Sequence, residues 1–360
     1  MAAEEGLPQF ETSADVIVER VGSLGRIRLN RPKAMNSLTH AMVHLIAPAL
    51  DAFEKDAVIA AVLLTGEGER GLCAGGDIRA LYEGERTPDG TGAQFWRDEY
   101  RVNARIARFP KPYVAVMDGI TMGGGIGLSA HGAHRIVTER SRIAMPEVGI
   151  GFVPDVGGTW LLAHAPGEIG TYLALTGEAI GPADAIYAGL ADVQIPLAGI
   201  PALIDELTQL TPGTGNAAIH TLLAKHAMQP ETARLAGHRA LIDQCFAGSS
   251  VEAILQALEA DGTPFALKTR DLIASKSPTS LKLTFRLIRL AREAEGLEEC
   301  LEREFAAAVA VAQGHDFYEG VRAAIIDKDR NPRWSPPSLA EVDDGNIEAW
   351  IQPVADRVFG

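Results

Sequence analysis

Two acidic residues, Glu147 and Asp155, stand inside the otherwise apolar segment Ala144–Gly158, which reads AMPEVGIGFVPDVGG. An acid among such residues is partly desolvated, and desolvation raises the pKa of a carboxyl group. A carboxyl group with a raised pKa is suited to proton transfer or to attack on an electrophile. Two other interpretations stay open at this point. Asp155 would cap a helix that starts near Gly157, and Glu147 would be an exposed loop acid.

Two glycine-rich turns supply the complementary chemistry. One is Gly71–Asp77 (GLCAGGD), and the other is Ile120–Gly127 (ITMGGGIG), which follows a short apolar run. Consecutive glycines at a strand-to-helix junction let bare backbone approach a ligand, with free N–H groups at the helix N-terminus. One N–H from each turn would form an oxyanion hole, and losing one such donor typically costs about 10²–10³ in rate. Together with buried carboxylates, this indicates acyl or enolate chemistry.

The sequence does not match several other catalytic and nucleotide-binding motifs. The turn Gly123–Gly127 does not complete G-x-G-x-x-G because Leu128 replaces the last glycine, and no G-K-[ST] follows either turn. A nucleophile elbow would need glycine where His131 stands. His131 and His134 are interpreted as structural residues. No cluster of His, Cys and Asp has ligand spacing, so no metal site is predicted.

The turns need strands and helices to hold them. Val16–Val21 and Arg26–Leu29 read as a hairpin, and Ser37 or Thr39 would cap a helix that runs to about Lys55. Further predicted elements are the strands Ala60–Thr65 and Tyr113–Met117, the helix Gln94–Arg108, and short strands Arg135–Val137 and Arg142–Ala144 around a polar turn. The chain is mostly helical from Gly167 onward. We predict an α/β fold with a tail over residues 1–13, a core over 14–210 and a helical region over 211–360.

Composition excludes several functions. The 360 residues are 47% hydrophobic, and the net charge is 33 − 47 = −14, which argues against nucleic acid or an anionic membrane as partner. No apolar run is long enough for a transmembrane helix, and no secretory signal is visible. The cysteines Cys73, Cys245 and Cys300 are odd in number and far apart, which indicates reduced thiols. A cytoplasmic location is therefore expected.

The motifs in order resemble a known family. LNRPKAMNSL, GLCAGGDI, GITMGGGIGL and AMPEVGIG are similar to those of the crotonase (enoyl-CoA hydratase/isomerase) superfamily, over about Val16–Pro196. The branch of 3-hydroxyisobutyryl-CoA hydrolases is suggested by CAGGDIRALYE, FWRDEYRVN, PDVGG, SPTSLK and GHDFYEGVRAAIIDKDRNPRW. The resemblance implies a spiral of stacked β-β-α units, a helical C-terminal region that packs on the core, and an acyl-CoA thioester as substrate.

The resemblance also implies roles for individual residues. The backbone N–H groups of Gly76 and Gly124 would form the oxyanion hole. The substrate contacts would be Ala74, whose backbone lines the adenine site, Asp77, Glu99, and Lys33 at the CoA phosphates. For Lys33 and Glu99 the other interpretation is an ordinary solvated side chain. No cofactor is implied, because coenzyme A is part of the substrate. The resemblance is also compatible with a homo-oligomer.

The same resemblance separates the candidate reactions. Hydratases of the superfamily match Glu147 but carry a second glutamate where this chain has Gly127. The hydrolase branch matches Glu147 and Asp155, which favours hydrolysis of 3-hydroxyisobutyryl-CoA to 3-hydroxyisobutyrate and CoA, a step of valine breakdown. Glu147 would either attack the thioester or activate water, and Asp155 would orient the substrate hydroxyl or assist proton transfer to the thiol. The alternatives are an enoyl-CoA hydratase or isomerase and a non-catalytic acyl-CoA binder.

Overall fold

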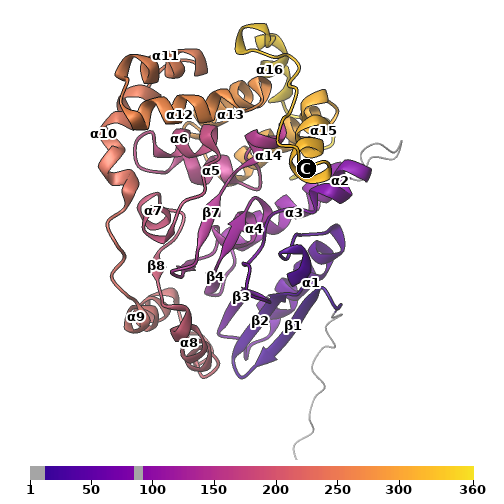
Figure 1. The fold of residues 1–360 in the computed structure, drawn as a ribbon. Helices are drawn as coiled ribbons and strands as arrows, with labels where there is room; N and C mark the ends of the chain where they lie inside the picture. Colours follow the sequence, from indigo (N-terminus) through magenta and orange to yellow (C-terminus); the bar gives the residue numbers. More distant parts are fainter. Residues whose placement is uncertain (1–12, 85–91) are drawn as a thin grey trace, which may run out of the picture.

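Six strands form the main sheet in the order β1-β2-β3-β4-β6-β8 (Figure 1). β1 and β2 form the predicted antiparallel hairpin, and the other neighbouring strands are parallel. The strands are β1 Val16–Val21, β2 Leu24–Leu29, β3 Ala61–Gly66, β4 Tyr113–Met117, β6 His134–Val137 and β8 Val193–Gln194. This computed structural model describes residues 13–84 and 92–360, so almost all of the predicted tail over residues 1–13 lies outside the described residues.

Both faces of this sheet are covered by apolar side chains. In β3, Val62 and Leu64 join the larger buried cluster, whereas Ala61 and Leu63 join a smaller cluster on the opposite face. The smaller cluster is completed by helices α8 (Ile200–Leu207) and α9 (Asn216–His226), which lie at the lower left in Figure 1. Burial on both faces explains why this strand has a continuous apolar sequence without polar alternation.

A second, two-stranded sheet carries the turn that precedes the central glycines. Its strands are β5 (Ile120–Met122) and β7 (Arg142–Ala144), which pair in parallel. Residues 120–122, predicted as the start of the glycine-rich turn, are therefore a strand, because β7 supplies their backbone partners. β6 and β7, predicted as neighbours around a polar turn, enter different sheets. β4, β5 and the following helix α4 (Gly124–Ser129) form one β-β-α unit of the predicted spiral.

Helices from the first half of the chain frame the glycine turns. Helix α1 begins directly after its cap Thr39, whose side chain accepts a hydrogen bond from the N–H of Met42, and ends at Lys55 as predicted. The short helix η1 precedes it, and η2 and α5 follow β7. The bounds are η1 Pro32–Ala34, α1 His40–Lys55, α2 Ile78–Gly84, α3 Gly92–Ala107, η2 Glu147–Ile150, α5 Gly158–Ala163, α6 Ile169–Thr176 and α7 Pro182–Tyr187.

The C-terminal helices lie against the other end of the core, above the sheet in Figure 1. α13 packs on α5 and α6, α14 packs on α3, and α15 packs on η2. Among the described residues no helix is both long and apolar enough to cross a membrane. The bounds of these helices are α10 Arg234–Phe246, α11 Val251–Asp261, α12 Pro264–Ala274, α13 Pro278–Ala291, α14 Leu297–Ala312, α15 His315–Val321, η4 Arg322–Ile326, η5 Leu339–Glu341 and α16 Asp344–Trp350, whereas η3 (Leu197–Gly199) directly precedes α8. The predicted division near residue 210 stays a prediction.

Candidate active site

The two glycine-rich turns meet at Gly76 and Gly124. Leu38 bridges the first turn through the carbonyl of Gly75 and the N–H of Asp77, which leaves the N–H of Gly76 outside the bridge. Gly124 opens α4, where an N–H group has no partner inside the helix. A Cβ atom added at Gly124 would lie 3.4 Å from the nitrogen of Gly76. The two N–H groups are therefore close enough to serve one oxygen atom.

Three carboxyl groups line the same cavity, whose volume is about 180 Å³. Glu99 comes from α3, Glu147 opens η2, and Asp155 lies just before α5. Their exposed fractions are only 2%, 7% and 6%, respectively. Glu147 is thus not an exposed loop acid, and Glu99 is not a solvated helix residue.

Burial and mutual repulsion govern the charge of Glu99 and Glu147. Oε1 of Glu99 and Oε2 of Glu147 are buried and have no hydrogen-bond partner among the described residues. Burial raises the pKa of Glu99 well above its usual value, and the charges of Asp155 and Glu147 raise it further. Burial, followed by the charge of Asp155, likewise raises the pKa of Glu147. Three such groups in one cavity share protons, which suits them to proton transfer.

Asp155 has a specific partner, Tyr100 of α3. The phenol O–H donates a hydrogen bond of 2.7 Å to Oδ2 of Asp155, and both side chains are buried. Burial raises the pKa of Asp155 to about 7, although the hydrogen bond from Tyr100 opposes the rise. The side chain of Asp155 faces the cavity and does not cap α5. Its carboxyl group is therefore poised to exchange a proton near neutral pH.

The cap of α5 comes instead from Glu304, a fully buried residue of α14. Its carboxylate accepts hydrogen bonds from the N–H of Gly157 at 2.7 Å and from the N–H and hydroxyl of Thr159 at 2.9 and 2.5 Å. These bonds fix the turn that follows Asp155. The sequence analysis overlooked Glu304, although an acid inside the apolar run of LEREFAAAVAVA was a visible signal. It also gave no role to Tyr100.

Position 127 has no room for the second acid of a hydratase. A Cβ atom added at Gly127 would lie 2.7 Å from Nδ2 of Asn103 and 2.7 Å from Cβ of Val156. Real Cβ atoms do not approach other atoms this closely, so even alanine would require α3 or the Asp155 turn to move. Packing therefore requires glycine at position 127, where hydratases of the superfamily carry their second glutamate.

The remaining predicted substrate residues divide into two groups. Ala74 lines the cavity with the glycines. Asp77 does not line it, because its carboxylate accepts a 3.1 Å hydrogen bond from Arg31 and faces the N–H of Ala80 at 3.4 Å. Lys33 lies exposed on η1, also away from the cavity lining. Ala74 thus lines the cavity, whereas Asp77 and Lys33 do not. The predicted contacts of Ala74 with adenine and of Lys33 with the CoA phosphates stay predictions.

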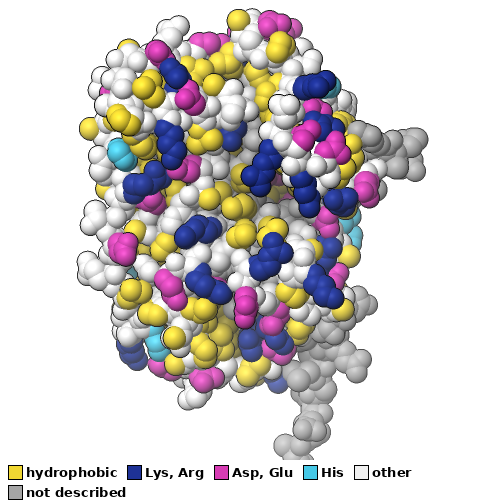
Figure 2. Space-filling model, viewed as in Figure 1, with side chains coloured by type: hydrophobic (Ala, Val, Ile, Leu, Met, Phe, Trp, Pro, Cys, Tyr) yellow, Lys and Arg dark blue, Asp and Glu magenta, His cyan; other side chains and the backbone are white. Residues whose placement is uncertain are grey.

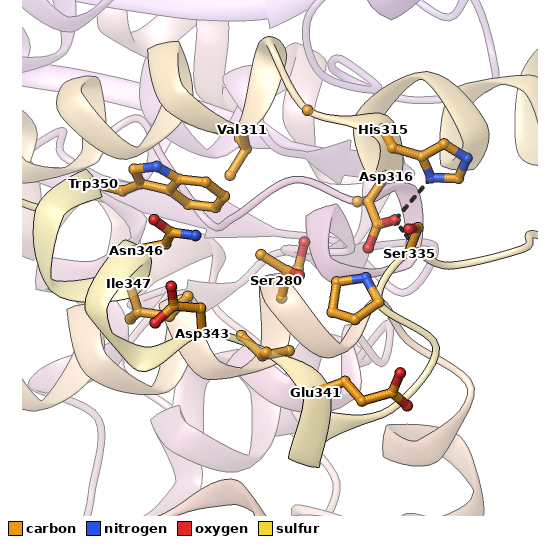
Figure 3. Close-up of a pocket in the computed structure, with 15 residues that line it drawn as sticks. Ser280, Val311, His315, Asp316, Ser335, Glu341, Asp343, Asn346, Ile347 and Trp350 are labelled. Carbon is orange, nitrogen blue, oxygen red and sulfur yellow. Dashed lines mark hydrogen bonds and ion pairs between the residues drawn. The ribbon is translucent and has the colours of Figure 1, made fainter.

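A second cavity, of about 270 Å³, lies among the C-terminal helices (Figure 3). It is lined by residues such as Ser280 of α13, Asp316 of α15 and Trp350 of α16. Figure 3 shows the Asp316 carboxylate joined to His315 and Ser335. None of the predicted catalytic or substrate residues lines this cavity, so the smaller cavity beside Gly76 and Gly124 is the candidate active site.

The geometry and fold define the crotonase class, and comparison with known proteins agrees. The sequence profile of the family described as "Enoyl-CoA hydratase/isomerase" matches residues 24–351. The chain belongs to this family, as the motifs predicted. A curated relative from Gallus gallus, named "3-hydroxyisobutyryl-CoA hydrolase, mitochondrial", is 41% identical, over 96% of this chain and 91% of that protein. The human protein of the same name is 39% identical, over 94% of this chain and 88% of its own length.

Two solved structures confirm the fold. A carnitinyl-CoA dehydratase from Mycobacterium thermoresistibile superposes with a TM-score of 0.90 at 46% identity, covering 96% of this chain and 98% of that one. An enoyl-CoA hydratase from Rhodobacter sphaeroides gives a TM-score of 0.87 at 43% identity, covering 94% and 98%. The names of these two structures differ from those of the curated relatives in reaction type, although all concern acyl-CoA chemistry.

The expected cytoplasmic location is contradicted by these relatives. Those from Gallus gallus, Xenopus tropicalis, Rattus norvegicus and Homo sapiens are all named as mitochondrial. Cys73, Cys245 and Cys300 are free and buried, which agrees with reduced thiols. Reduced thiols, however, fit any reducing compartment and could not single out the cytoplasm.

The contacts of Glu304 lead to a stability prediction. Glu304→Gln replaces one acceptor oxygen by an NH₂ group that must face backbone or hydroxyl donors. We expect a loss of about 1–3 kcal/mol in the free energy of unfolding, because buried donors lose their partner. Urea unfolding measures it. Glu298→Gln, on the exposed face of the same helix and paired with Arg108, is the control and should change stability by about 0–1 kcal/mol. Equal effects would contradict the buried cap.

Proposed function

We propose that this protein hydrolyses the thioester of a short-chain 3-hydroxyacyl-CoA, with 3-hydroxyisobutyryl-CoA as the first substrate and a role in valine breakdown. The observation that carries the proposal is the pairing of Glu147 and Asp155 beside the N–H groups of Gly76 and Gly124, with no space for a second acid at Gly127. The names of the curated relatives support the same substrate.

The proposed reaction uses these groups in order. The thioester carbonyl oxygen accepts hydrogen bonds from Gly76 and Gly124, which stabilise the negative charge that develops on it. The carboxylate of Glu147 either adds to the carbonyl carbon, forming a mixed anhydride that water then cleaves, or takes a proton from the water that adds. In both routes the C–S bond breaks, and Asp155 gives its proton to the departing sulfur. The proposal requires no cofactor, because CoA enters as part of the substrate.

Coenzyme A carries phosphates, so its binding requires local cations on a chain of net charge −14. Figure 2 shows Lys and Arg side chains spread across the middle of one face of the molecule. Arg79 of α2 donates a hydrogen bond of 3.4 Å to the carbonyl of Ile325, which lines the cavity. This hydrogen bond supports Arg79 as a cation beside the cavity that could contact a phosphate.

The second candidate is a hydratase or dehydratase that acts on an acyl-CoA. The names of the two similar solved structures favour it. In that reaction Glu147 and Asp155 would move a proton and a hydroxyl group across a carbon–carbon bond and leave the thioester intact. The crowding at Gly127 argues against the usual second glutamate but leaves Asp155 as an acid partner. Product analysis therefore has to separate the two reactions.

The deciding experiment offers the protein 3-hydroxyisobutyryl-CoA and, separately, crotonyl-CoA. We expect free thiol from the first substrate, measured with a thiol reagent, and no loss of enoyl absorbance from the second. Absorbance loss without thiol release would establish the hydratase reaction and overturn the proposal. Absence of both signals would favour a non-catalytic acyl-CoA binder or another acyl group.

Replacing Glu147 by Gln should abolish this turnover. The amide cannot attack the thioester or accept a proton, and loss of such a group typically lowers kcat by about 10²–10⁴ or more. CoA binding, measured by calorimetry, should persist because the backbone donors and the cavity remain. Glu298→Gln serves as the surface control.

Near-normal activity of Glu147→Gln would remove Glu147 from the mechanism. The two routes are separated by quenching the wild type during turnover. An acyl adduct on Glu147, found by mass spectrometry, would identify attack by the carboxylate on the thioester. Absence of the adduct under rapid quench would favour the route in which Glu147 takes a proton from water.

The pH profile tests Asp155 as the proton donor. Its acid form is lost as pH rises through about 7, so the rate should fall there. Tyr100→Phe removes a hydrogen bond that lowers the pKa of Asp155. Such a bond to a charged group is worth about 1.5–3 kcal/mol, so the alkaline limb of kcat/KM should move up by about one to two pH units.

The control for this shift is Tyr113→Phe. Tyr113 is equally buried, but its hydroxyl donates to the carbonyl of Leu128 and contacts none of the three carboxyl groups. Its profile should match that of the wild type. An unchanged alkaline limb in Tyr100→Phe would show that Asp155 does not set it.

A further inference from the structure

A compact group of metal-binding side chains lies outside the active site, on helices α1 and α3. His40, His44 and Asp98 each offer one ligand atom, and these atoms all lie within 4.8 Å of one another. Nε2 of His40 is 2.8 Å and Nε2 of His44 is 3.0 Å from the same oxygen, Oδ2 of Asp98. The two imidazole rings lie side by side, with their centroids 4.2 Å apart. Three potential ligands therefore converge on one point.

The backbone arranges this convergence. His40 and His44 are four residues apart on α1, so they project from the same face, one turn above the other. Asp98 reaches them from α3, which packs against α1. No metal site was predicted, because no cluster of His, Cys and Asp along the sequence has ligand spacing. The spacing His-x₃-His was visible, but the third ligand comes from a helix that starts beyond residue 90.

The surroundings hold Asp98 in place without blocking the two histidines. Nε2 of Gln94 donates to both oxygens of Asp98 at 3.0 Å, and a guanidinium nitrogen of Arg101 lies 3.6 Å from Oδ1. The side chain of Asp98 is 18% exposed, whereas those of His40 and His44 are 32% and 60% exposed. The site is thus open to solvent on the histidine side, and its carboxylate is fixed by second partners, as in natural metal sites.

We propose that His40, His44 and Asp98 bind a divalent transition-metal ion of the zinc class. Two imidazole nitrogens and one carboxylate oxygen form a common donor set for Zn²⁺, with a fourth position left for water. Bonds of about 2.0–2.1 Å in a tetrahedral arrangement place ligand atoms about 3.3 Å apart. The two His–Asp separations need to open by only a few tenths of an ångström, which small side-chain rotations supply.

An ion at this position would join the two helices that frame the oxyanion hole. Leu38, two residues before His40, holds both neighbours of Gly76 through its backbone. On α3, the ring of Phe95 packs perpendicular to the ring of His40 and also lines the active-site cavity, and Asp98 directly precedes Glu99. The metal would therefore stabilise α1 and α3 in the arrangement that the active site uses. This inference does not depend on the proposed thioesterase reaction.

Zinc titration of the full chain tests the site directly. The protein is prepared without a polyhistidine tag, stripped with a chelator and titrated with Zn²⁺ in a calorimeter. We expect saturation at one ion per chain and a rise in Tm on loading, because the ion binds only the folded state. Cu²⁺ used as a probe should give an electron paramagnetic resonance spectrum with coupling to two imidazole nitrogens.

Single substitutions assign the ion to its ligands. His44→Gln and Asp98→Asn should each weaken Zn²⁺ binding by about tenfold or more and abolish the Tm rise. His44 is mostly exposed, so its loss should leave the fold intact. The matched control is His226→Gln, which removes a histidine that lies 2.9 Å from Glu206 and belongs to no group of three potential ligands among the described residues.

The control should bind Zn²⁺ as the wild type does. Equal binding by the wild type and His44→Gln, or no saturable binding by the wild type, would overturn the proposal. In that case the three side chains only form hydrogen bonds that connect α1 and α3. Both results are read from binding and Tm, so they stand apart from any failure of the thioesterase assay.

Discussion

The burial of three carboxyl groups in one small cavity is the constraint on which the rest of the site depends. Removing a charged carboxylate from water is costly, and neighbouring negative charges add to that cost, so Glu99, Glu147 and Asp155 favour protonated forms. Tyr100 donates one hydrogen bond to Asp155, which partly offsets the cost of a negative charge on that carboxyl group. The three groups thereby differ in how readily they ionise, although they share a cavity.

Glycine makes such a crowded site possible. A Cβ atom at Gly124 would lie 2.5 Å from Oε1 of Glu99, and one at Gly123 would lie 2.9 Å from Oε1 of Glu147. The carboxyl groups therefore rest against bare backbone, at the same turn that offers its N–H to a substrate oxygen. Any side chain there would push the acids away from the donors. The triple glycine serves the packing of the acids as much as the approach of a ligand.

Local signals in the sequence were sufficient for the elements and for part of the site. The cap Thr39, the apolar run of β3 and the two glycine turns depend on neighbours in sequence, so they could be predicted. Tyr100 and Glu304 could not be given roles, because their partners are 55 and 147 residues away. The roles of the predicted substrate residues stay predictions, and only Ala74 of Ala74, Lys33 and Asp77 lines the cavity.

The C-terminal helices are part of the site and not a separate attachment. Glu304 of α14 fixes the turn after Asp155, and α15 fixes the turn after Glu147. At Gly151 an added Cβ would overlap the carbonyl oxygen of Asp316, and at Gly320 it would overlap the carbonyl group of Ile150. Backbone therefore touches backbone at the C-terminal end of η2. Because both acid-bearing turns are held from the C-terminal region, the geometry of Glu147 and Asp155 depends on the packing of that region on α3, α5 and η2.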